Sequence, residues 1–180
     1  MAIRYIRHPN ITLEDDLWCD EQAEIFANMD EKLNETFADD EDLSLEITKR
    51  FPYTFTVVKD NDKRIGYTYI LPATNDLMNK FSKKELTEGE VVKIINDRIR
   101  YNNCDAAYLA GAVFIKQYQN KGHAVRATLD TLIHMDKERG MKIKDLYIWP
   151  LTDSMHNIID KAKRFAEKQG RILHVHNQKE

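Results

Sequence analysis

The residues whose types and spacing most clearly suggest a binding site are Gln119-Asn-Lys-Gly122-His-Ala124. They follow an apolar run and precede a helical pattern. Glycine and small residues at a strand-to-helix turn let the backbone come close to a ligand. The free N–H groups of a helix's first turn attract an anion. Lys116, Lys121 and Arg126 add positive charge around the turn. This pattern predicts a site for a phosphate group.

The turn differs from the two common glycine-rich phosphate loops. The chain contains no G-x-x-x-x-G-K-[ST] sequence of the P-loop and no G-x-G-x-x-G fingerprint of dinucleotide-binding folds. Both motifs are therefore excluded, and backbone N–H groups of the turn itself remain as the predicted anion ligands.

In this stretch the chain resembles the GNAT superfamily of N-acetyltransferases, whose acetyl-coenzyme A (acetyl-CoA) signature is Q/R-x-x-G-x-G/A. Gln119, Gly122 and Ala124 occupy its defined positions, after an apolar strand and before a helix. The order of the predicted elements over about residues 1–175 is similar to that of the family. The resemblance implies a single acetyltransferase domain over 1–180, with a helical insert at about 74–100. It also implies acetyl-CoA as co-substrate, with no metal.

The same resemblance assigns the coenzyme-binding residues. It implies that the pyrophosphate is held by the backbone N–H groups of Lys121, Gly122, His123 and Ala124. By the same resemblance, the polar side chains of Gln119 and Asn120 lie beside it. It also implies that Ala112, Val113 and Phe114 pair with the pantetheine arm like an added strand. The thioester then lies between Val113-Phe114 and the end of the strand at 146–149.

The mechanism implied is direct transfer, in which a neutral amine attacks the thioester carbonyl and a base or water takes the proton. Tyr108 stands where some relatives carry a glutamate base, but a phenol is a poor base at neutral pH, and a buried core tyrosine is an equal alternative. The helix at 153–168 lacks the tyrosine acid of many members. Ser154 and His156 are its polar substitutes, and the acid stays unassigned.

Histidines offer two further candidates. His123 fills a variable position of the signature, and we expect it to face solvent. His174-Val-His176 could hold a metal, but no Cys, Asp or further His stands close by in the sequence. Surface positions are therefore the preferred interpretation, and we expect no metal.

Charge is distributed unevenly along the chain. Residues 1–60 contain 6 basic and 15 acidic residues, whereas residues 61–180 contain 21 basic and 15 acidic. In the resembled fold the acidic N-terminal helices border the acceptor side of the cleft, which implies a cationic amine as substrate. A solvated acidic face that keeps the protein soluble explains the pattern equally well.

Hydrophobic periodicity predicts the elements that position these residues. The apolar run at 106–115 predicts a central strand covered on both faces, and alternation at 53–57 and 65–71 predicts an antiparallel hairpin. Further strands are expected at 3–5, 146–149 and 172–175, and helices at 14–37, 43–51, 74–100, 121–139 and 153–168. The fold class is α/β, with a mixed, mostly antiparallel central sheet flanked by helices. The resemblance adds a GNAT-like splay between the fourth and fifth strands.

Three local signals refine the helices. Ser82-x-x-Glu85 and Thr87-x-x-Glu90 are capping-box candidates, and Gly140 is expected to end a helix in a left-handed conformation. In the first helix, Ile25, Phe26, Met29, Leu33 and Phe37 form the stripe expected to face the core.

Composition narrows the class of protein. The net charge of −3 gives no basic excess that would favour nucleic acid. Cys19 and Cys104 lie far apart in the sequence and lack zinc-ribbon spacing, so we expect neither a disulfide scaffold nor a zinc ribbon, which indicates a reducing compartment. The apolar run at 106–115 is about half a membrane span, and the first residues lack the apolar stretch of a signal peptide. We therefore expect a soluble cytoplasmic protein with no membrane partner, and leave a homodimer open.

The sequence thus predicts an N-acetyltransferase that moves an acetyl group from acetyl-CoA to a primary amine, either a cationic small molecule or a peptide amine. The alternative is a non-catalytic protein. It would be a CoA-binding module, or an interaction module with an acidic docking face.

Overall fold

The computed structural model describes residues 2–7, 9–27, 41–140, 143–150, 156 and 159–176. In that part of the chain six strands form one sheet in the order β1-β2-β3-β4-β5-β6. The strands are β1 (Ile3–Arg7), β2 (Phe55–Asp60), β3 (Lys63–Ala73), β4 (Ala106–Phe114), β5 (Asp145–Ile148) and β6 (Ile172–Val175). The α-helices are α1 (Leu13–Ala27), α2 (Glu41–Arg50), α3 (Asn75–Ser82), α4 (Glu88–Arg98), α5 (His123–Arg139) and α7 (Ile159–Lys168).

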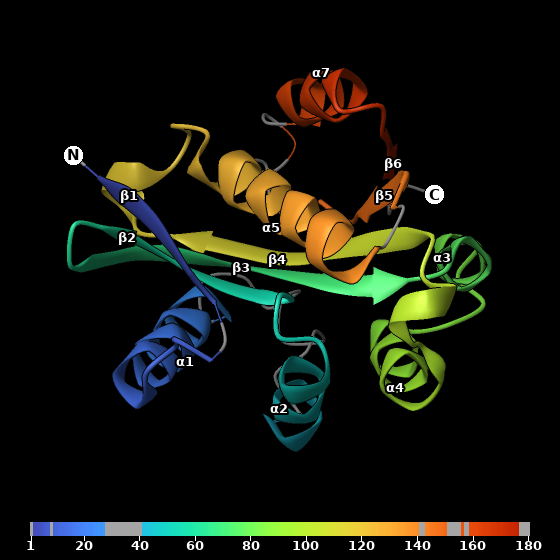
Figure 1. Cartoon of the computed structure of the whole chain (residues 1–180), viewed down its shortest axis with the longest axis horizontal. Coiled ribbons are helices and arrows are strands. Elements are labelled where there is room, and N and C mark those ends of the chain that lie inside the picture. The colour runs from blue at the N-terminus through green and yellow to red at the C-terminus, as the bar shows by residue number, and fades with distance from the viewer. Residues whose placement is uncertain are drawn as a thin grey trace.

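The sheet is open and mixed. Strands β1 to β4 pair antiparallel with one another, whereas β4 with β5 and β5 with β6 pair in parallel. Helices lie on both faces, with α5 and α7 on one side and α1, α2 and α4 on the other (Figure 1). The predicted α/β class with a mostly antiparallel sheet is confirmed at this level.

The predicted central strand is β4, which lies between β3 and β5. Its first residues, Ala106 to Tyr108, are buried because α4 and α3 cover one face of the sheet and α5 the other. The helix after β4 ends as predicted, with Gly140 as the C-cap at a φ of 65°.

The region 74–100 forms two helices instead of one. Thr87 begins α4 with a complete capping box, since its hydroxyl accepts from the Glu90 N–H and the Glu90 carboxylate accepts from the Thr87 N–H. The other candidate is wrong, because Ser82 is the last residue of α3. The same short polar spacing occurs at both ends of helices, and only the apolar run after Thr87 separates the two cases.

The predicted apolar stripe of the first helix is wrong at Ile25, which is 46% exposed. The helix instead buries Asp15 and Cys19 against the sheet. Asp15 faces inward because Lys59 and Arg64, on β2 and β3, bind its carboxylate at 2.7 and 2.5 Å. The side chain of Phe26 and the residues Met29, Leu33 and Phe37 lie outside the described part of the chain.

None of the helices that the structure describes is both long enough and apolar enough to cross a membrane.

Candidate functional site

The strands β4 and β5 separate halfway along β4. They pair only from Ala106 with Asp145 to Leu109 with Ile148, whereas β4 continues alongside β3 as far as Phe114. Residues 109–113 are half-buried, although β4 lies within the sheet. Among the described residues no strand pairs with this side of residues 110–114, which we call the open edge of β4.

A β-bulge marks the same position. Tyr69 of β3 pairs with Gly111, and the next residue, Ile70, pairs with Leu109, so Ala110 is an extra residue on β4. A bulge bends its strand and increases the local twist. The bend therefore lies where β4 leaves β5, and it accounts for the separation of the two strands.

Two backbone positions face the open edge. Ile115 N–H donates to Ile65 O at 3.1 Å, and in an antiparallel ladder successive residues alternate between facing the partner strand and facing away. Val113 therefore faces β3, while Ala112 and Phe114 turn their N–H and C=O groups to the open edge. The Gln119 side chain agrees with this assignment, since its amide donates to Phe114 O at 2.8 Å.

The turn after β4 exposes the start of α5. Gly122 is the N-cap residue, with a φ of 80°, and no side chain caps the helix. Asn120 also has a positive φ, of 59°. A Cβ on Gly122 would meet nothing within 4 Å, so the space beside it is open. The first N–H groups of α5 thus lie at an uncapped helix start, where an anion binds favourably.

The turn is held by contacts to the strands. Tyr118 donates its hydroxyl to Asp60 Oδ2 at 2.9 Å, which ties the turn to the end of β2. The Lys121 ammonium lies 5.3 Å from the centre of the Tyr118 ring. The side chains of Gln119 and Tyr118 both have partners in the protein, so they brace the turn.

His123 does not face solvent as expected, because only 4% of it is exposed. Its ring stacks on Phe114 at 6.2 Å and lies 5.7 Å from the ring of Tyr118. Burial, together with the positive charges of Arg126 and Lys121, lowers the pKa of His123. The residue is therefore a neutral aromatic contact that connects the helix start to the strand end. Its backbone N–H group still belongs to the uncapped first turn.

Tyr108 forms a buried pair with a residue that the sequence did not single out. Its hydroxyl donates to Glu88 Oε1 at 2.5 Å, and the two side chains are 2% and 6% exposed. Burial raises the pKa of Glu88 to about 7, although the hydrogen bond from Tyr108 opposes the shift. Burial and the neighbouring carboxylate raise the pKa of Tyr108 well above its ordinary value.

The pair lies beside aromatic side chains near the end of β5. The Phe81 ring lies 5.5 Å from the rings of Tyr108, Trp149 and His176. Tyr108 immediately precedes Leu109, the last residue of β4 that pairs with β5. A titratable pair thus stands next to the beginning of the open edge.

The other predicted catalytic residues are not brought to this place. Ser154 lies outside the described residues, and His156 is exposed, with no contact to the open edge that the structure records. His174 does meet an acidic partner, since its Nε2 lies 2.7 Å from Asp145 Oδ1 and its ring stacks on Tyr147 at 4.5 Å. Asp145 is 29 residues away in the sequence, which is why sequence reasoning missed it. The described residues contain no group of three metal-ligating side chains.

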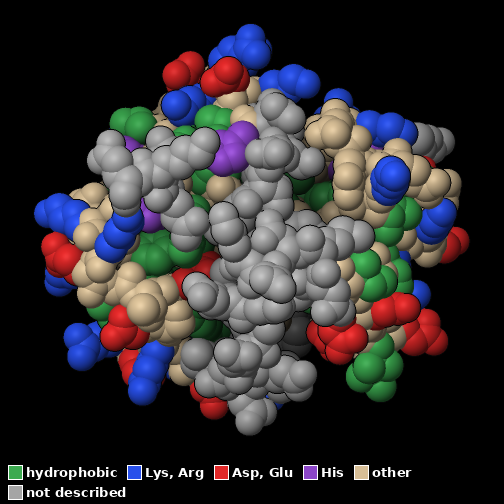
Figure 2. Space-filling view, turned by 180° about the vertical axis from the view of Figure 1, so that it is seen from behind, with side chains coloured by type: hydrophobic (Ala, Val, Ile, Leu, Met, Phe, Trp, Pro, Cys, Tyr) green, Lys and Arg blue, Asp and Glu red, His purple; other side chains and the backbone are tan. Residues whose placement is uncertain are grey.

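Acidic side chains gather over α1 in the lower right part of Figure 2. On this helix Asp16, Asp20, Glu21 and Glu24 are exposed, whereas Asp15 is fully buried. Burial alone would raise the pKa of Asp15, but hydrogen bonds from Lys59 and Arg64 hold it at about 2. Asp15 is therefore a structural anchor of the helix and is unavailable to a substrate.

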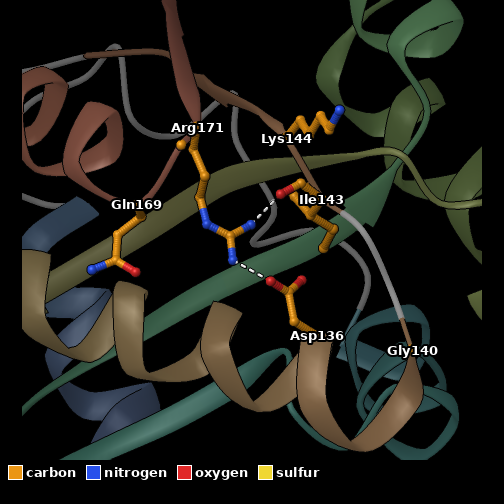
Figure 3. A pocket seen from close by; sticks show the side chains of 7 residues that line it. Asp136, Gly140, Ile143, Lys144, Gln169 and Arg171 are labelled. Carbon is orange, nitrogen blue, oxygen red and sulfur yellow. Dashed lines mark hydrogen bonds and ion pairs between the residues drawn. The ribbon is translucent and has the colours of Figure 1, made fainter.

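A hollow at the far end of α5 has a structural role (Figure 3). Arg171 is 6% exposed and reaches between Ile143 and Asp136, where it donates to the carbonyl oxygen of Ile143 and to the Asp136 carboxylate at 2.5 Å. The pair joins the end of α5 to the start of β6. Its arginine is paired with Asp136, so the contact holds these elements together.

Comparisons with protein-family models, curated protein sequences and solved structures find no match to this chain. The inference of function therefore depends on the open edge, the uncapped helix start and the Glu88–Tyr108 pair.

Proposed function

We propose that this protein is a GNAT-type N-acetyltransferase that moves an acetyl group from acetyl-CoA to a primary amine. The observation that carries the proposal is the juxtaposition of an open strand edge with an uncapped helix start. The open edge of β4 runs directly into the Gly122 turn, so one extended ligand with a diphosphate can use both.

The residues present fit acetyl-CoA. The backbone N–H groups of Lys121 to Ala124 would hold the pyrophosphate, at an N-cap whose open space admits a bulky anion. The backbone of Ala112 and the N–H group of Phe114 would pair with the amide groups of the pantetheine arm, as a strand added to the sheet does, whereas the Phe114 carbonyl already accepts from Gln119. Lys116, Lys121 and Arg126 are exposed and add positive charge around the anion.

The bound coenzyme supplies an activated acyl group, and the chain supplies its position and a route for the proton. The pantetheine arm, held along the open edge, would bring the thioester towards Leu109 and Ile148, where β4 and β5 separate. There a neutral amine attacks the thioester carbonyl. The exposed acidic residues of α1 favour a cationic acceptor, whose ammonium group loses a proton before it reacts.

Titration calorimetry with acetyl-CoA, followed by a thiol-release assay with an amine panel, tests this proposal. The panel contains spermidine, a lysine-containing peptide and a peptide with a free N-terminus. We expect saturable binding and release of CoA with at least one amine. The absence of heat at millimolar acetyl-CoA would overturn the proposal. Binding without turnover on any amine would identify a non-catalytic CoA-binding module instead.

A further inference from the structure

The Glu88 carboxyl group is buried with one of its two oxygens unpartnered. Oε1 accepts the hydrogen bond from Tyr108, while Oε2 is buried with no hydrogen-bond partner among the described residues. Glu88 is only 6% exposed. A buried carboxylate with a single donor is costly in its charged form. Burial therefore favours the neutral, protonated form of Glu88 over the carboxylate.

The position of this group relates it to the proposed site. The carboxyl group binds Tyr108, which lies one residue before the end of the β4–β5 ladder. Phe81 contacts both Tyr108 and Trp149, the residue that follows β5, at 5.5 Å. Tyr108 and Glu88 thus lie on the α4 side of the point where the two strands separate.

We infer that Glu88 is a positioning residue for acetyl transfer, which accepts the proton of the acceptor amine through the hydroxyl group of Tyr108. This inference rests on the proposed function and assigns the proton acceptor that the function requires. The amine nitrogen forms a bond to the thioester carbon, the C–S bond breaks, and its electron pair goes to sulfur. The nitrogen's proton passes to the Tyr108 oxygen while the hydroxyl proton moves to Glu88 Oε1. The thiolate takes a proton from solvent.

The carboxylate removes the difficulty that Tyr108 alone presents. A tyrosine acting as a base must begin as phenolate, which burial and the neighbouring acid make unfavourable here. A neutral hydroxyl that gains one proton while it gives another to Glu88 needs no phenolate. General-base catalysis is most effective when the pKa of the base lies near the working pH, and the pKa of Glu88 is close to neutral.

Among the residues that the structure describes, the titratable and charged groups nearest Glu88 come from β4, the end of β6, α2 and α4. Tyr108 is its titratable neighbour on β4, and His176, the residue after β6, lies beyond the Phe81 ring. Burial first, and then Lys84, lowers the pKa of His176. From α2, which packs on α4, Glu46 and Arg50 contact Asn96 further along the helix. On α4 itself the carboxylate of Glu90 is exposed and caps the helix start.

The test measures kcat and KM against pH for the wild type, Glu88→Gln, Tyr108→Phe and the double variant, with the best amine of the panel. Wild-type kcat is expected to rise with pH through an inflection near 7, as the carboxyl ionises. Glu88→Gln should lower kcat by about 100-fold and abolish the inflection, with KM for acetyl-CoA changed by less than about twofold. The double variant should lose no more than either single variant, because the two groups act as a unit.

Two further variants separate this role from a structural one. Glu90→Gln makes the same substitution in the same helical turn, at an exposed residue, and should leave kcat within about twofold of the wild type. Glu88→Asp keeps a carboxyl group and should retain the pH inflection with a partial recovery of kcat. It also serves as the test if Glu88→Gln fails to fold.

The outcomes distinguish this inference from the proposed function. Turnover by Glu88→Gln with wild-type kcat and pH profile, or a loss confined to KM, would overturn the inference and leave the acetyltransferase intact. A wild type that binds acetyl-CoA without acetylating any amine would overturn the inference and leave CoA binding. A wild type that does not bind acetyl-CoA would overturn both.

Discussion

The ring of Phe114 lies flat against Gly66, so closely that a Cβ on Gly66 would be 2.3 Å from the nearest ring carbon. The two residues are paired across β3 and β4. The same ring stacks on His123, the first residue of α5. Gly66 therefore provides the space in which Phe114 connects the end of β4 to the start of the helix.

Gly66→Ala should destabilise the protein and disturb this connection. The added methyl group meets a ring that also stacks on His123, so either the ring or the strand must move, at a cost of about 1–3 kcal/mol. Urea denaturation measures the loss. Gly111→Ala is the matched control on the adjacent strand, because its Cβ would meet only the Tyr69 Cβ at 3.9 Å. Equal stability of the two variants would contradict the packing argument.

Gly122→Glu should weaken acetyl-CoA binding by at least about tenfold, because it places a negative charge at the helix start where the diphosphate is proposed to bind. Isothermal titration calorimetry measures the affinity. Gly140→Glu is the matched control, since Gly140 has a similar positive φ and similarly open surroundings at the other end of α5. Both substitutions carry the same backbone strain, so an equal loss of affinity would argue against a site at Gly122.

The sequence was sufficient to predict those strands whose apolar residues form a clear run or a regular alternation. The apolar run at 106–115 and the alternation at 53–57 and 65–71 predicted β4 and the β2–β3 hairpin. The alternation does not mean that one face of the hairpin is exposed, because Thr56 and Thr68 are fully buried. The prediction of an apolar stripe on the first helix was wrong at Ile25 for a physical reason. Asp15 is buried by two cations that lie about 45 to 50 positions later, on β2 and β3, and no period in the helix itself reports them.

The candidate site was predictable only where it is local. Gly122 and its helix start follow from a short motif, and the structure gives Gly122 the positive φ that such a turn requires. Glu88 was missed because its partner Tyr108 is 20 residues away and the pair forms only when α4 packs on β4. The burial of His123 depends in the same way on Phe114 and Tyr118, which reach it from the strand end and the turn.

Asp15→Asn should lower stability at neutral pH, with a difference that disappears in acid. The folded-state pKa of Asp15 is about 2, below its ordinary 3.8, so its carboxylate stabilises the protein above about pH 4. That contribution, about 2 kcal/mol, is lost as pH falls towards 2. Urea denaturation at several pH values checks this expectation. Glu14→Gln, which removes an 85% exposed partner of Arg64, should cost well under about 1 kcal/mol. A pH-independent gap between Asp15→Asn and the wild type would show that packing, and not charge, is lost.

Glu88→Gln should change the pH dependence of stability in the opposite sense. Burial raises the folded-state pKa of Glu88 from 4.5 to about 7, so between these values the folded protein holds a proton that the unfolded chain releases. Stability therefore falls as pH rises from about 4.5 to about 7, by about 3 kcal/mol in all from this one group, and levels off above that pH.

Glutamine cannot ionise. The free energy of unfolding of Glu88→Gln should therefore rise relative to that of the wild type as pH increases from about 5 to about 8, as measured by urea denaturation at each pH. Glu90→Gln supplies the control. Hydrogen bonds from the Thr87 backbone and side chain lower the pKa of Glu90, so its contribution is lost only in acid and should not vary over that interval. Parallel stability curves for Glu88→Gln and the wild type would show that the Glu88 carboxyl group is already ionised at pH 5. A glutamate of that kind would have no proton-accepting role tuned to neutral pH.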